Sequence, residues 1–186
     1  MRKDRDPVCP INAVRKDHET RNLDAFVLFI QDNAFIIGFP KIVCNLLPQL
    51  STSPVLHYAV VAIGALHEKR NSANYMRVGF KPRVAAMDSY HASMVALQAC
   101  LGGNYVLRRD DVLWATFFLG LFELLSDQSG EGWVKHMLYE TSKMLQLAGP
   151  SGCMSSNRQS FFDLFRILEA SRSMIYSEET ILSQEC

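Results

Sequence analysis

Residues 53–69 read SPVLHYAVVAIGALHEK, and this stretch decides the fold. Ser53 and Pro54 form a helix-start signal, because a serine hydroxyl accepts a hydrogen bond from a free amide and proline fits the first helical position. The residues that follow are apolar on nearly every face, which predicts a helix from Pro54 to Lys69 at the centre of a domain. Gly64 in a helix interior costs about 1 kcal/mol relative to alanine, so we expect another helix to approach it closely.

Further segments on both sides have helical spacing of apolar residues, and almost none alternates with the period of a strand. The predicted helices span about 23–32, 82–101, 131–148 and 156–176, with another that begins at Asp110 or Asp111 and carries residues 114–125. We interpret Gly38 and Pro40 as a break after the first helix. The prediction is an all-α fold, an irregular helical bundle of about six to seven helices, with a flexible tail over 1–20 and a single helical domain over 21–186.

The composition fits a globular intracellular protein, cytoplasmic or nuclear. Of the 186 residues, 48% are hydrophobic, and 19 basic residues balance 19 acidic ones, so the chain has no bulk attraction for nucleic acid. The amino terminus has no apolar core of signal-peptide length. The longest apolar run, Val112 to Leu125, is too short to cross a bilayer and contains Glu123. We therefore expect no direct nucleic-acid binding and no membrane span.

The five cysteines predict neither a disulfide framework nor a metal site. They are odd in number, far apart, and include no CxxC pair; they are Cys9, Cys44, Cys100, Cys153 and Cys186. The sequence also contains no GxSxG, no phosphate-binding glycine loop and no dinucleotide fingerprint. We expect no metal and no cofactor.

Three stretches resemble a known family. Residues 46–70 read LLPQLSTSPVLHYAVVAIGALHEKR, a small-residue helix after a serine-proline turn. Residues 88–103, DSYHASMVALQACLGG, precede residues 110–150, DDVLWATFFLGLFELLSDQSGEGWVKHMLYETSKMLQLAGP, in which an apolar helix ends in a glutamate and a Gly-Pro pair closes the next helix. Residues 161–183 read FFDLFRILEASRSMIYSEETILS. In this order they resemble the regulatory domain of fungal zinc-cluster transcription factors.

The resemblance covers roughly three quarters of the chain but only the first half of the family's regulatory domain. It implies an all-α bundle and a nuclear regulator that responds to metabolic state. The zinc cluster of the family needs cysteines a few residues apart, and the spacing here departs from that pattern. The resemblance therefore implies regulation without the usual DNA-binding module.

Glu123 is the acidic residue inside the apolar run. A carboxylate there must be paired, hydrogen-bonded or protonated, because an isolated buried charge is very unfavourable. It is a candidate general acid or base if burial raises its pKa. The alternative is a structural contact with Arg172 or a backbone amide, and the family likeness includes this glutamate. His91, three residues after Asp88, is a second candidate for proton transfer.

His136 and Glu140 lie four residues apart and therefore on one helical face, with Trp133 and Tyr139 on nearby positions. An imidazole held by a carboxylate can move protons near pH 7, so His136, Glu140 and Tyr139 are candidate catalytic residues. A packing or capping role for the histidine is the alternative.

Aromatic side chains are the candidates for binding an apolar ligand. Trp114, Phe118 and Trp133 could line a site between helices, since such sites are mostly apolar with a few polar groups. Ordinary core packing is the alternative for all three.

Three functions compete. The first is a binding module that holds a small apolar metabolite or a partner protein in fungal secondary metabolism, with a homodimer covering apolar surface. The second is a repurposed cofactor-independent enzyme that isomerises, cyclises, dehydrates or oxidises a reactive metabolite through a His/Glu pair. A degenerate fragment that dimerises with a full-length factor is a third. We place the binding module first.

Overall fold

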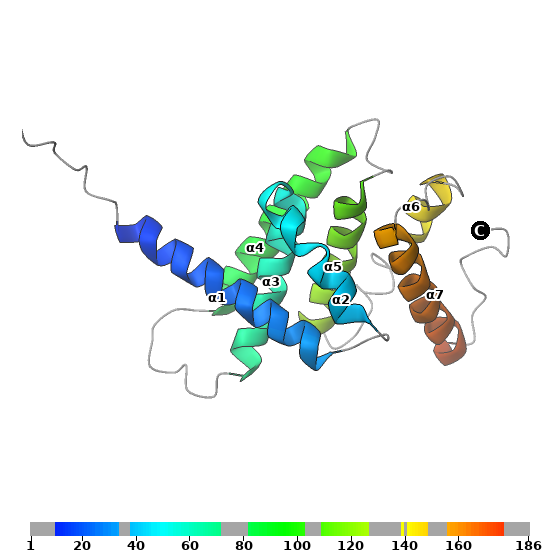
Figure 1. Ribbon diagram of the computed structural model, residues 1–186, viewed down its shortest axis with the longest axis horizontal. Helices are drawn as coiled ribbons and strands as arrows, with labels where there is room; N and C mark the ends of the chain where they lie inside the picture. Colours follow the sequence, from blue (N-terminus) through cyan, green and yellow to red (C-terminus); the bar gives the residue numbers. More distant parts are fainter. Residues whose placement is uncertain are drawn as a thin grey trace, which may run out of the picture.

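The computed structural model describes residues 10–33, 38–71, 82–102, 109–126, 139, 141–148 and 156–176. Their elements are helices throughout, so the predicted all-α class is confirmed. Figure 1 shows α3 at the centre, α1 crossing it, and α7 at the side opposite the free end of α1. The elements are α1 (Pro10–Asp32), α2 (Phe39–Cys44), the 3-10 helix η1 (Leu47–Ser51), α3 (Pro54–Asn71), α4 (Pro82–Leu101), α5 (Asp110–Ser126), α6 (Thr141–Ala148) and α7 (Ser156–Tyr176).

The central position predicted for residues 54–69 is confirmed. Helix α3 packs against α1, α4 and α5, and its apolar residues from Val55 to Leu66 are buried except His57 and Tyr58. The Ser53 hydroxyl accepts a hydrogen bond from the Leu56 amide at 3.4 Å, as expected of the residue before the helix. A helix buried on so many sides fixes the positions of its three neighbours.

Gly64 is the point of closest approach between α1 and α3. A Cβ atom at this position would lie 1.8 Å from the backbone oxygen of Asn22, so only glycine fits. Two further contacts join these helices: His57 pairs with Glu19, and the His67 Nε2 lies 3.7 Å from an oxygen of Asp32. Residues along α1 meet residues along α3 in the same order, so the two helices cross with their amino-terminal halves in contact and their carboxy-terminal ends in contact.

The segment between α1 and α3 differs from the prediction. Helix α1 ends at Asp32, so the chain breaks after the first helix as predicted, but Gly38 and Pro40 also start α2. Gly38 adopts a left-handed φ of 82° and Pro40 occupies the first turn. Helix α1 also begins at Pro10, earlier than the predicted Leu23. The boundary between a tail and the domain stays a prediction.

Helix α5 is the second buried element, as predicted, and α7 packs against it. Trp114 of α5 meets Phe161 of α7 edge to face, with ring centroids 5.0 Å apart. Near the first residues of both helices, the Arg158 Nε donates a 3.0 Å hydrogen bond to Asp110, and Arg158 is only 3% exposed. The predicted helix over 131–148 is described over α6 and residue 139, and the rest of it lies outside the described residues.

Candidate functional site

The candidate site lies where the second half of α5 faces the first half of α4. The Tyr90 hydroxyl donates a 2.6 Å hydrogen bond to Oε1 of Glu123. The Tyr90 ring stacks on Phe122, with centroids 4.8 Å apart and planes 19° apart. The two helices run antiparallel, since Cys100 at the end of α4 meets Arg109 just before α5. This arrangement brings an aromatic hydroxyl and a carboxylate together from residues far apart in the sequence.

The second oxygen of Glu123 defines what the site can do chemically. Oε2 is buried and has no hydrogen-bond partner among the residues that the structure describes. Burial, then the hydrogen bond to Glu123 and its charge, raise the pKa of Tyr90 well above its usual value, so the tyrosine stays protonated and acts as donor. The site therefore combines one satisfied and one unsatisfied acceptor oxygen beside an aromatic stack.

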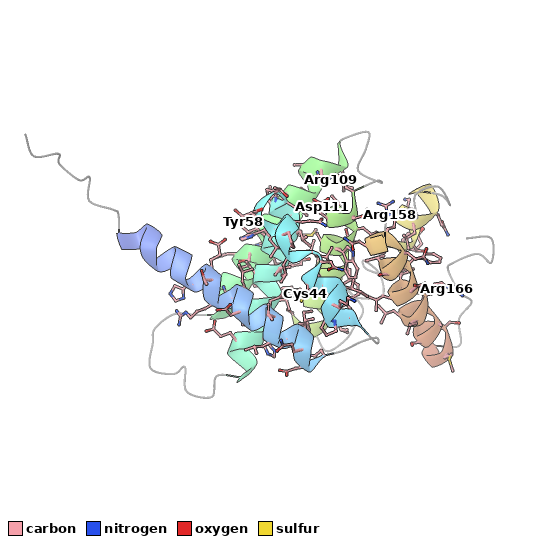
Figure 2. The ribbon with its side chains drawn as sticks, in the orientation of Figure 1. Cys44, Tyr58, Arg109, Asp111, Arg158 and Arg166 are labelled. Carbon is pink, nitrogen blue, oxygen red and sulfur yellow. The ribbon has the colours of Figure 1, made fainter. Side chains whose placement is uncertain are left out.

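A separate polar cluster stands at the start of α5, where Figure 2 shows Arg109, Asp111 and Arg158 at the same end of the bundle. Arg109 donates two hydrogen bonds to the Asp111 carboxylate, at 3.1 and 2.6 Å. Burial by itself would raise the pKa of Asp111, but the hydrogen bonds from Arg109 and Ser53 outweigh it and hold this pKa below its usual value. Since each charge here has an opposite charge or a donor, this cluster connects elements and is not an open site.

Of the other predicted proton-transfer residues, the two that the structure describes, His91 and Tyr139, do not join Glu123. His91 and Asp88 are exposed on α4, although the His91 ring lies 5.8 Å from the ring of its neighbour Tyr90. Tyr139 is 58% exposed. His136 and Glu140 lie outside the described residues, as does the side chain of Arg172, so their predicted roles stay predictions.

The aromatic residues proposed for ligand binding fall into two groups. Trp114 and Phe118 are fully buried and pack against rings of α1, α2 and α7, including Phe26 at 5.3 Å from Phe118. Trp133 lies outside the described residues. Trp114 and Phe118 thus fill the interior between helices, and contact with a ligand stays a prediction for all three.

Tyr90 was not among the partners predicted for Glu123 from the sequence. The order of the helices indicates that α4 and α5 form an antiparallel pair, but it does not give the register that places Tyr90 opposite Glu123. Ser93, one turn further along α4, was also missed; its hydroxyl donates a 2.8 Å hydrogen bond to the Val55 carbonyl of α3. Because Ser93 fixes α4 on α3, it also sets the position of Tyr90.

Two further observations concern only the described residues. They contain no group of three or more histidine, cysteine, aspartate or glutamate side chains placed to hold a metal ion. None of their helices combines the length and apolar character needed to cross a bilayer.

Comparison with known proteins agrees with the resemblance in the sequence. Neither the curated proteins nor the solved structures include a significant match. The family described as "Fungal specific transcription factor domain" matches residues 43–185, a range that runs from α2 to beyond α7 and includes Tyr90 and Glu123. The chain belongs to the fungal-specific transcription factor domain family.

Proposed function

We propose that this chain is a regulatory module of a fungal transcription regulator that acts in the nucleus and binds a small, mainly apolar metabolite of secondary metabolism. The observation that carries the proposal is the family match over residues 43–185. A regulator that responds to metabolic state needs a ligand-responsive element, and an all-α bundle with apolar interhelical surfaces is suited to that role. A partner protein and a homodimer stay predictions.

The surroundings of Glu123 support the choice of ligand. Met87 and Met94 lie one turn before and one turn after Tyr90 on the same side of α4, and both are partly buried against the core. Methionine side chains adapt to irregular shapes because they are flexible and polarisable. Apolar surface with one or two polar groups is typical of small-molecule sites.

The enzyme alternative has no supporting observation. Within the described part of the chain, His91 and Tyr139 are exposed, and the partner of Glu123 is a tyrosine whose raised pKa keeps it protonated. Proton transfer by His136 and Glu140 stays a prediction.

Native mass spectrometry of the purified chain, before and after incubation with a fungal metabolite extract, tests the proposal. We expect a mass increase of one small molecule and an extract whose chromatogram is unchanged apart from that molecule. Conversion of extract components would support the enzyme and contradict the proposal.

Regulation is tested separately by fusing the chain to a heterologous DNA-binding module and measuring a reporter gene. We expect the reporter output to change when the captured metabolite is added. The matched control is the DNA-binding module alone, whose output should not respond. An output equal to the control with and without metabolite would contradict a regulatory role.

A further inference from the structure

Three other partly buried carboxylates are each paired with a basic side chain, and Glu123 differs from them in its partner. Asp111 accepts two hydrogen bonds from Arg109, Asp110 accepts one from Arg158, and Glu19 pairs with His57. Each of these acids meets a basic group. Glu123 meets the neutral hydroxyl of Tyr90, and its Oε2 has no donor within the described residues.

An unsatisfied carboxylate oxygen away from water is unfavourable, because both its charge and its hydrogen-bonding capacity lack compensation. A hydroxyl group of a ligand would supply the missing hydrogen bond. A protonated amine would supply the bond and the opposite charge, and charge-assisted hydrogen bonds are roughly twice as strong as neutral ones. The adjacent, partly exposed Tyr90 ring adds attraction for a cation that lies near its face.

From these contacts we infer that Glu123 is the binding residue for a protonated amine on the metabolite, whose apolar body lies against Tyr90, Met87 and Met94. The inference rests on the proposed function and adds the chemical class of the ligand. Glu123 and Tyr90 are both partly exposed, so the pair lies at the edge of the α4–α5 contact. Oε2 itself is covered. The amine reaches it when the carboxylate turns about its terminal torsion, which has a broad energy minimum in glutamate.

The test is isothermal titration calorimetry of the full chain with three probes of similar size: 2-phenylethylamine, 2-phenylethanol and 3-phenylpropionate. At pH 7 the first is a cation, the second is neutral and the third is an anion. We expect the amine to bind about tenfold more tightly than the alcohol, and the anion to bind more weakly than either. Equal affinity for the amine and the alcohol would overturn the inference without any variant being needed.

Two variants locate the site. Glu123→Gln keeps the shape of the side chain and removes its charge, so affinity for 2-phenylethylamine should fall about tenfold while the alcohol is unaffected. Asp88→Asn is the matched control, because Asp88 is an exposed acid on the same helix as Tyr90, and it should leave amine affinity unchanged. Loss of amine binding in Asp88→Asn to the same extent as in Glu123→Gln would indicate general charge attraction and overturn the inference.

The metabolite captured from the extract separates this inference from the proposed function. If Glu123→Gln captures it as well as the unaltered chain does, the amine site is wrong and the binding module stands. If neither protein captures a metabolite, the proposed function itself fails. Circular dichroism of Glu123→Gln should match that of the unaltered chain, since the tyrosine can still donate to the amide oxygen.

Discussion

Replacing Gly64 by alanine tests the contact between α1 and α3. The added Cβ would lie 1.8 Å from the carbonyl oxygen of Asn22, 2.7 Å from its carbonyl carbon and 3.1 Å from the Phe26 amide nitrogen. All three are backbone atoms, so no side-chain rotation relieves the clash. Because ordinary contacts of a Cβ begin near 3.4 Å, α1 must move away from α3 by roughly 1.5 Å in a close-packed interior.

The magnitude follows from the side chains that α1 buries. Phe26, Phe29 and Ile30 are each no more than 3% exposed, and full burial of such a side chain is worth about 1.5–3 kcal/mol. A gap of this size removes about half of the favourable contact energy, which gives a loss of roughly 3 kcal/mol for the three. Alanine is about 1 kcal/mol better than glycine in a helix. We therefore expect a net destabilisation of about 2 kcal/mol, or a Tm lower by about 4–8 °C.

Urea unfolding followed by the helical circular dichroism signal measures this difference. The control is Gly102→Ala at the end of α4, where the nearest atom to an added Cβ is the Ala99 oxygen at 4.0 Å; its free energy of unfolding should change by less than about 0.5 kcal/mol. If Gly64→Ala is as stable as the unaltered chain or more stable, helix propensity alone governs this site and the close approach of α1 is refuted. Adding Asn22→Ala should restore nothing, since the obstruction is backbone.

Three further predictions concern the ends of helices. Gly38→Ala should lower stability by about 1 kcal/mol, because Gly38 has a φ of 82°, and a Tm equal to that of the unaltered chain would contradict a left-handed start of α2. Arg158→Met should lower the free energy of unfolding by about 1.5–3 kcal/mol, because it removes the donor to Asp110. In a double-mutant cycle with Asp110→Asn we expect a coupling energy between the two residues, and additive effects would contradict the contact. The lowered pKa of Asp111 adds stability above the unfolded pKa of about 3.9, and this stability is lost as pH falls through the lower folded pKa. The free energy of unfolding should fall less between pH 5 and pH 3 in Asp111→Asn than in the unaltered chain. An equal fall in both proteins would refute the lowered pKa.

Most of the helices were predictable from the sequence because their ends have unambiguous chemistry. Three predicted helix ends agree with the structure. They are the start at Ser53 and Pro54, the start at Asp110 and Asp111, and the end before Gly102. The segment 38–51 was not predicted, since glycine and proline can either end one helix or start the next. Whether a new helix starts here depends on whether Phe39 and Val43 can pack into the core, and both are buried. Tertiary packing decides this, and local sequence does not contain it.

Of the two residues that form the candidate site, only one was predicted from the sequence. Glu123 stood out because an acid within an apolar run needs a partner. The structure shows Tyr90 of α4 as a partner, and the sequence does not contain the way in which α4 and α5 face each other. Contact with Arg172 stays a prediction. The register of these helices is set by contacts such as that of Ser93 with the Val55 carbonyl, which depends on the position of α3. Pairing between helices therefore could not be obtained from the periodicity of either helix alone.

Helix α1 lies outside the family match, which begins at residue 43, yet it is part of the same core. Phe26 is fully buried and packs edge to face on Phe118 of α5, 5.3 Å between ring centroids. The absence of a side chain at Gly64 leaves space that only the α1 backbone occupies. Removing α1 would uncover this face of α3 and the Phe118 ring, which is apolar surface that a folded domain buries. The unit that folds therefore extends before the family match, because α3 can only be central when helices cover it on both sides.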